Sequence, residues 1–235
     1  MRLYWFKGSP REERNFGDCI APVLMRAFTG TTAAWTPPEK AEVFSIGSIA
    51  SKIPDGFRGT VLGTGTISKD VKKDLSRARV LAIRGAASRE ACRLPRETLL
   101  GDPGILVPIL FPDVKLAPTY DQVICPHYID NAMKKRHPGL AHVDILGSHR
   151  AVVAGIARAR TLITSSLHAL ICADALGVPH ILEPHPLVRG GLWKFNDYAS
   201  VFGETITPGV RRLTKRPAML AKQAELRAAF RKLAP

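Results

Sequence analysis

His168 is a candidate for acid–base chemistry because it stands at the predicted start of an apolar helix. Ser165 or Ser166 can cap this helix, and Gly177 followed by Pro179 predicts its end. The first helical turn exposes free backbone N–H groups and the positive end of the helix dipole, so the stretch predicts an anion site. The simpler alternative is a histidine held by a local hydrogen bond, and these residues alone favour it.

Two cations lie at positions where they could bind an anionic substrate. Arg84 ends a wholly apolar run and precedes a glycine, and its planar guanidinium matches a carboxylate or a phosphate. Lys194 lies in the aromatic segment 193–198, and its ammonium suits a phosphate. The alternatives are an ion pair across a domain edge for Arg84 and a surface loop for Lys194, and the residues leave both open.

Two turns carry glycines beside polar side chains. Gly63, Thr64 and Gly65 follow an apolar run, but they lack the third glycine of a dinucleotide fingerprint and the lysine of a P-loop. They predict either a tight strand-to-helix turn or a phosphate contact. Asn15 and Asp18 precede or begin the first expected helix, where each can cap the helix or approach a ligand.

The elements that must position these residues alternate along the chain as short apolar runs and helix-like segments. Such alternation predicts an α/β fold with mostly parallel sheets, which we expect to form two Rossmann-like domains. The expected strands are 3–6, 43–46, 60–62, 80–83, 98–100, 122–125, 143–146, 161–164 and 180–182. The expected helices are 18–28, 69–75, 86–94, 151–158, 167–176 and 218–233.

The ends of the expected strands predict where a ligand binds, since ligands of open α/β sheets bind beyond the carboxyl ends of the strands. Five of these ends carry glycines or functional groups, at 63–66, 84–85, 101–104 (with Asp102), 164–168 and 183–185. We therefore expect a cleft lined from both halves of the chain. The proline-containing stretch 110–120 predicts the boundary between an N-terminal domain, 1–115, and a C-terminal domain, 116–205, followed by a basic helical segment, 206–235.

Composition narrows the class of protein. The formal charge of +14, from 34 basic and 20 acidic residues, favours anionic partners, or else reflects a solvated basic surface. The four cysteines are widely separated and form no CxxC pair, so we expect a reducing compartment and no cysteine metal site. The first apolar run is too short for a signal peptide, and none of the apolar stretches is long enough to cross a bilayer. These features predict a cytoplasmic protein, and any contact with a membrane would have to be peripheral.

Taken in order, the motifs make the chain resemble the polysaccharide pyruvyl transferases, and among them the ketal-pyruvate transferases of the succinoglycan type. The block from Ser165 to Pro179 is the most specific part of the resemblance, which spans residues 15 to 203. Ser166 stands where many relatives have arginine. The matching pieces are Asn15-Phe16-Gly17-Asp18, Gly63-Thr64-Gly65, Ile83-Arg84-Gly85 with Ser88, Gly101-Asp102-Pro103, Ser165-Ser166-Leu167-His168-Ala169, Ala173-Asp174-Ala175-Leu176-Gly177-Val178-Pro179 and Lys194-Phe195-Asn196-Asp197-Tyr198.

The resemblance implies two Rossmann-like domains that face a cleft, similar to the glycosyltransferase B architecture. It also implies transfer of a pyruvyl group from phosphoenolpyruvate to a sugar of an exopolysaccharide or its lipid-linked precursor, with a pyruvate ketal as product. Carried over by position, His168, Arg84 and Lys194 are the expected catalytic and donor-site residues. The turn at 63–65 with Ser165 and Ser166 would assist in binding the donor anions, and the reaction as written needs neither a metal nor an organic cofactor.

Ketal formation requires a proton donor and acceptor, and a histidine is the natural candidate at neutral pH. We therefore expect His168 to be the acid–base residue, with Asn15, Asp18 and Asp102 orienting the acceptor. A sugar-nucleotide-dependent glycosyltransferase of similar architecture is the alternative function. A non-catalytic glycan- or nucleic-acid-binding protein fits less well, because the basic residues are scattered rather than interleaved with aromatic ones; nucleic acid is not an expected partner.

Overall fold

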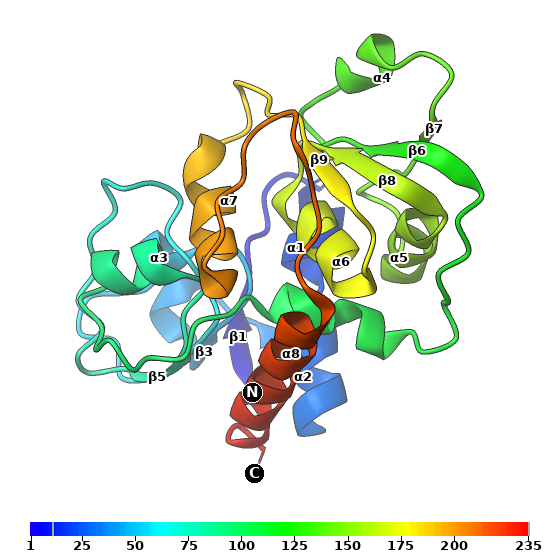
Figure 1. Cartoon of the computed structure of the whole chain (residues 1–235). Helices are drawn as coiled ribbons and strands as arrows, with labels where there is room; N and C mark the ends of the chain where they lie inside the picture. The colour runs from blue at the N-terminus through cyan, green and yellow to red at the C-terminus, as the bar shows by residue number, and fades with distance from the viewer. Residues whose placement is uncertain (11, 235) are drawn as a thin grey trace.

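The computed structural model describes residues 1–10 and 12–234, which form an α/β fold with two sheets (Figure 1). The first sheet is wholly parallel and has the order β2-β1-β3-β4-β5. Its strands are short, so each contributes only a few residues to the core. They are β1 (Arg2–Tyr4), β2 (Ala34–Trp35), β3 (Val43–Phe44), β4 (Thr60–Leu62) and β5 (Arg79–Ala82).

The second sheet lies in the other half of the chain and has the order β10-β9-β8-β6-β7. It is parallel except for β10, which pairs antiparallel with β9. Its strands are β6 (Tyr120–Cys125), β7 (Ala141–His142), β8 (Ala159–Thr164), β9 (His180–Leu182) and β10 (Arg211–Arg212). The expected class, α/β with two mostly parallel sheets, is confirmed. The expected domain limits, 1–115, 116–205 and 206–235, stay a prediction.

The helices fill the space around and between the two sheets, as Figure 1 shows. The α-helices are α1 (Phe16–Cys19), α2 (Ala21–Thr29), α3 (Ala86–Ala91), α4 (Met133–Arg136), α5 (His149–Ala157), α6 (Leu167–Leu176), α7 (Gly191–Ala199) and α8 (Arg216–Arg231). The short 3-10 helices are η1 (Glu12–Arg14), η2 (Pro38–Lys40), η3 (Ala50–Lys52), η4 (Pro103–Leu110) and η5 (Ser200–Phe202). None of the helices in the described part of the chain could cross a bilayer.

Helix α6 has the bounds that the sequence predicts, because local signals set both of its ends. Ser166 is the N-cap in extended conformation, although its side chain makes no capping hydrogen bond. Gly177 ends the helix at φ 86°, a left-handed conformation that glycine adopts without strain. Between these ends nearly every residue is buried, since α6 packs against η4, α5 and β8. The helix is therefore a rigid support for the side chains at its start.

Four expected elements differ from the structure. The predicted strand 98–100 is reduced to a single bridge between Ile83 and Leu100, and the predicted strand 143–146 is replaced by a turn that follows β7. The predicted helix 18–28 is split into α1 and α2, with Pro22 in the first turn of α2, where its missing N–H is tolerated. The predicted helix 69–75 is irregular, because its mostly charged residues offer little apolar surface to bury.

One hydrophobic core joins the two halves of the chain. It contains Leu3 and Leu24 from the first half and Leu162 and Leu170 from the second, together with Phe230 from α8. A smaller cluster, which includes Phe44 and Val61, covers the opposite face of the first sheet. The two sheets are thus held in one packed structure, and the carboxyl ends of their strands are fixed relative to each other.

Candidate functional site

A pocket of about 430 Å³ lies between residues of the two halves. Its wall comes from the segment after β1, α1 and the residue before it, η3 and the turn before it, the loop after β4, the loop after β6, the start of α6, and α7 with its preceding loop. Five residues that the sequence predicts for the site line it: Asn15, Asp18, Ser166, His168 and Lys194. Arg84, Ser165, Asp102 and the turn at 63–65 lie outside this lining.

His168 lies in the first turn of α6, and 11% of its side chain is exposed. Its ring packs so closely on Gly17 of α1 that a Cβ on this glycine would collide with it. Burial, followed by the charges of Arg84 and Lys194, lowers the pKa of His168 to about 3. The imidazole is therefore neutral at neutral pH, which the position at a helix N-terminus also favours.

Asp102 lies behind His168, on the N-cap of η4, and its side chain is fully buried. Its Oδ1 accepts a hydrogen bond from the Gly104 N–H at 2.8 Å. Its Oδ2 is 3.8 Å from His168 Nε2, and burial raises the pKa of the carboxyl to about 7. The structure thus brings Asp102 to His168 and not to the pocket surface, where an acceptor sugar could reach it.

Lys194 extends from α7 into the pocket with 6% of the residue exposed. Its Nζ is 5.4 Å from the centre of the Phe195 ring. Burial, followed by the charge of Arg84, lowers the pKa of Lys194 to about 8, against the opposing effect of Asp18. The ammonium is thus charged at neutral pH in a poorly solvated place, which favours an incoming anion.

Asn15 and Asp18 form the α1 side of the pocket. Asn15 Nδ2 donates a hydrogen bond to Asp18 Oδ2 at 2.6 Å. The Cα of Gly47 lies close by, since a Cβ on this residue would be 3.3 Å from Asp18 Oδ1. The pair therefore presents an oriented carboxylate that can accept a hydrogen bond from a sugar hydroxyl.

Arg84 is fully buried and paired, as the alternative interpretation of this residue predicts. Its Nε donates to Asp197 Oδ2 at 2.9 Å, and its other nitrogens donate to Ser48 Oγ and the Thr66 carbonyl, each at 2.6 Å. Because Ser48 lines the pocket, the guanidinium lies directly behind the wall. Arg84 thus acts on the pocket through its charge and through the geometry of α7, which carries Asp197.

The turn at 63–65 supports Arg84 and the core rather than the pocket surface. Thr64 Oγ1 donates to the Gly47 carbonyl at 2.8 Å. Gly63 has a φ of 84° and packs on Pro103, and a Cβ on Gly65 would collide with the Arg84 guanidinium. These contacts explain the two glycines by close packing. The turn is tight, as one alternative predicted, but it leads into an irregular segment and not into a helix.

The two serines before α6 have different environments. Ser165 Oγ donates to Asp130 Oδ2 at 2.9 Å and accepts a hydrogen bond from the His127 N–H at 2.9 Å. It therefore holds the loop after β6 against the pocket, while Ser166 itself lines the pocket. Ser166 and the uncapped start of α6 are thus the part of this motif that can meet a ligand.

Sequence reasoning missed three basic residues of the pocket: His127, Lys52 and Arg189. His127 follows β6 by two residues, so the rule of strand ends could have found it. Lys52 and Arg189 lie in segments without a distinctive motif, and only the fold brings them to the pocket. Within residues 1–10 and 12–234, His, Cys, Asp and Glu side chains form no cluster suited to a metal ion.

Comparison with known proteins leaves the family open. No protein-family model matches the chain. A stretch of 118 residues is 32% identical to an uncharacterized protein of Acanthamoeba polyphaga mimivirus. The match covers 44% of the chain and 40% of the viral protein, so the chain matches about two fifths of the length of this relative.

Proposed function

We propose that the protein transfers a pyruvyl group from phosphoenolpyruvate to two hydroxyls of a sugar, forming a pyruvate ketal. The sugar belongs to an exopolysaccharide or its lipid-linked precursor. The two halves correspond, in this proposal, to Rossmann-like domains of glycosyltransferase B type that face a donor cleft. The donor is a cytosolic metabolite, which sets the reaction on the cytoplasmic side, in peripheral contact with the membrane where the acceptor is lipid-linked.

The observation that carries the proposal is the buried ammonium of Lys194 beside the neutral imidazole of His168 in one pocket. Lys52 and Arg189 add positive charge to the same wall. Arg84 adds a further charge from its buried position behind Ser48. Phosphoenolpyruvate is small and carries a carboxylate and a phosphate, so it matches both the charge and the size of the pocket. An acid–base group beside a cationic site is what its chemistry requires.

In this proposal the cationic wall binds the two anionic groups, and Ser166 with the free N–H groups of α6 adds hydrogen bonds. His168 stands by the methylene carbon, which must gain a proton while a sugar hydroxyl attacks the neighbouring carbon. Asp18, oriented by Asn15, accepts a hydrogen bond from the second hydroxyl of the sugar. This second hydroxyl then replaces the phosphate, and the two protons released by the hydroxyls end on the methyl group and on the phosphate.

The test is phosphate release from phosphoenolpyruvate in the presence of candidate acceptor glycans, with mass spectrometry of the glycan for the ketal. We expect His168→Ala to lower turnover by roughly 10²- to 10⁴-fold. His142→Ala, which alters an exposed histidine of β7, is the matched control and should keep full activity. Full activity of His168→Ala would contradict the assignment of the acid–base residue.

Isothermal titration separates the proposal from the alternative of a sugar-nucleotide-dependent glycosyltransferase. The proposal predicts binding of phosphoenolpyruvate and none of nucleoside diphosphates. Tight binding of a nucleoside diphosphate sugar, without binding of phosphoenolpyruvate, would overturn it in favour of the glycosyltransferase.

A further inference from the structure

Two buried polar atoms that lack a hydrogen bond face each other behind the pocket. Among the described residues, three buried side-chain nitrogen or oxygen atoms have no hydrogen-bond partner, and two of them are Asp102 Oδ2 and His168 Nε2. They are 3.8 Å apart. An unpaired buried polar group costs about 1–3 kcal/mol, so two such atoms side by side call for an explanation.

The surroundings hold both side chains in this arrangement. Asp102 is anchored through Oδ1 to the Gly104 N–H, and η4, which follows it, packs against α6. His168 is wedged against Gly17 by its Nδ1 side. Because Nε2 faces Asp102, Nδ1 is the ring nitrogen on the side of α1, and His168 itself lines the pocket. A small closure would let the two atoms share one proton, which satisfies both.

We infer that Asp102 and His168 form one proton relay, in which Asp102 Oδ2 supplies a proton to His168 Nε2 as His168 Nδ1 delivers its own proton to the substrate. His168 is then the catalytic residue that touches the substrate, and Asp102 is a positioning residue that acts through it. The inference rests on the proposed function for the identity of the substrate. It does not require Asp102 to contact the acceptor sugar.

His168 alone would be a poor proton donor at neutral pH, and the relay supplies the proton that it lacks. With a pKa of about 3, caused mainly by burial, its imidazolium is scarce at neutral pH. Asp102, whose burial raises its pKa to about 7, keeps a transferable proton there. The charged and titratable groups around the pair are Arg84, Lys194, His127, Asp197 and Tyr198. The cations among them oppose an imidazolium, whereas a relay never forms one.

The protons balance when the relay donates to the methylene carbon and when it accepts from the hydroxyl. In the acid form Oδ2 and Nδ1 each carry a proton, and Nε2 has a lone pair. The alkene electron pair of phosphoenolpyruvate takes the Nδ1 proton to form the methyl C–H bond, and the Oδ2 proton moves to Nε2. The base form then has a carboxylate, Nε2–H and a free Nδ1 lone pair. That lone pair accepts the proton of the attacking hydroxyl as its oxygen bonds to the neighbouring carbon, and the Nε2 proton returns to Oδ2 in the same step, which restores the acid form.

The first experiment follows the ring nitrogens of His168 by ¹⁵N NMR in the wild-type protein, without substrate, from roughly pH 5 to pH 9. The relay predicts a neutral ring throughout, with the proton on Nδ1 at low pH and on Nε2 at high pH. The change should have its midpoint near 7, the pKa of Asp102. A tautomer that stays constant, or an imidazolium that forms near the ordinary histidine pKa, would overturn the inference.

The second experiment compares Asp102→Asn with Asp144→Asn. An asparagine at 102 can keep the hydrogen bond to Gly104 but cannot titrate, so His168 should stay protonated on Nδ1 at every pH. Transfer to the glycan should fall by roughly 10²- to 10⁴-fold and lose its pH dependence near neutrality. Asp144 is the control, because its Oδ1 accepts the Leu146 N–H at 3.0 Å in the same local pattern on an exposed site.

The two experiments keep this inference and the proposed function separate. A tautomer change in a protein that does not consume phosphoenolpyruvate supports the relay and overturns the proposed substrate. Consumption of phosphoenolpyruvate without a tautomer change supports the function and overturns the relay. Where Asp102→Asn fails to fold, the wild-type titration decides alone.

Discussion

At the scale of single residues, burial sets the pKa values of the two basic side chains that the proposal uses in the pocket. Lys194 and His168 are both bases, and burial is the first cause of the lowered pKa of each. Lys194 keeps its charge at neutral pH because its pKa remains about 8, while His168 does not. One side chain therefore serves to attract an anion and the other to exchange a proton without carrying charge.

Lys194→Met should weaken binding of phosphoenolpyruvate at neutral pH by roughly 10- to 100-fold, because it removes one charged hydrogen bond of about 1.5–3 kcal/mol. In the wild type, affinity should fall as pH rises through about 8, where the buried ammonium loses its proton. Isothermal titration at a series of pH values measures both effects. Lys134→Met, at an exposed position of α4, is the matched control, and equal affinity of the two variants would contradict the role of Lys194.

At the scale of elements, α7 is the connection between the two halves at the site. It lies between β9 and β10 of the second sheet in sequence, yet it packs on α3 of the first half. Asp197 accepts hydrogen bonds from Arg84 Nε, from the Ser88 N–H at 2.8 Å and from Ser88 Oγ at 2.5 Å. One turn earlier on the same helix, Lys194 enters the pocket, so the buried pair sets the position of the ammonium.

Asp197→Ala should lower the free energy of unfolding by about 3–5 kcal/mol, because it leaves the Arg84 guanidinium buried without its counter-charge. Adding Arg84→Met should recover part of the loss, since the unpaired charge is then gone. Urea denaturation measures both. Asp113→Ala breaks an ion pair with Arg150 in which more than half of each side chain is exposed, and it should cost at most about 1 kcal/mol. A similar cost for Asp113→Ala and Asp197→Ala would refute the argument.

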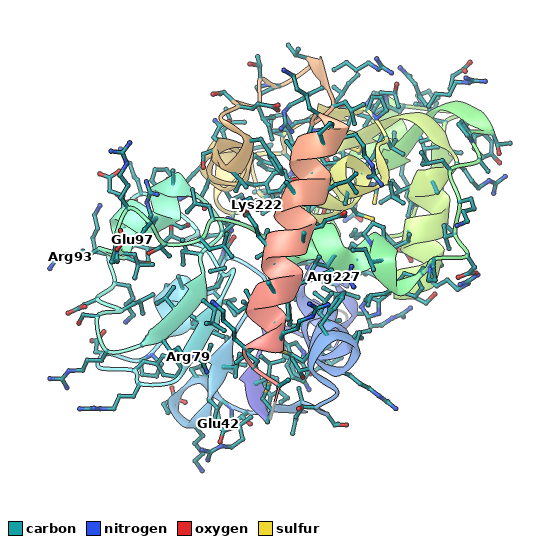
Figure 2. All side chains as sticks on the ribbon, turned by 60° about the horizontal axis from the view of Figure 1, so that its bottom comes forward. Glu42, Arg79, Arg93, Glu97, Lys222 and Arg227 are labelled. Atoms are coloured by element: carbon teal, nitrogen blue, oxygen red, sulfur yellow. The ribbon has the colours of Figure 1, made fainter. Side chains whose placement is uncertain are left out.

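At the scale of the whole molecule, α8 brings the end of the chain back to the first half. Figure 2 shows α8 across the middle of the molecule, with Lys222 and Arg227 labelled along it. The helix packs on α2, η4 and β5, and Arg79 donates a hydrogen bond to the Lys232 carbonyl at 3.1 Å. Its basic face is thus solvated, as expected, while its apolar face closes the shared core.

Leu226→Ala should lower the free energy of unfolding by about 2–5 kcal/mol, because this side chain of α8 is fully buried and packs on Gly101. Since one core joins both halves, we expect a single cooperative transition at lower denaturant concentration in both near- and far-ultraviolet circular dichroism. Leu220→Ala, on the same helix but 49% exposed, should change stability by at most about 0.5 kcal/mol. Two separate transitions would show that the halves unfold independently.

The sequence by itself determined the features that depend on neighbouring residues. The alternation of apolar runs and helices predicted the α/β class, and Gly177 and Pro179 marked the end of α6. It also placed Ser166, His168 and Lys194 among the candidates that the structure brings to one pocket. The sequence pattern gave wrong secondary structure in two segments where packing decides the conformation. The charged stretch 69–75 is not a helix, and the turn after β7 is not a strand.

Only the tertiary structure decided what the candidate side chains contact. Arg84 could be a ligand for an anion or half of an ion pair, and its partner Asp197 lies 113 residues further along the chain. The meeting of Asp102 with His168, and the arrival of His127 in the pocket, depend equally on how η4, α6 and β6 pack. Residue type limits which contacts a side chain can make, but its partners and its pKa are set by burial among segments distant in sequence.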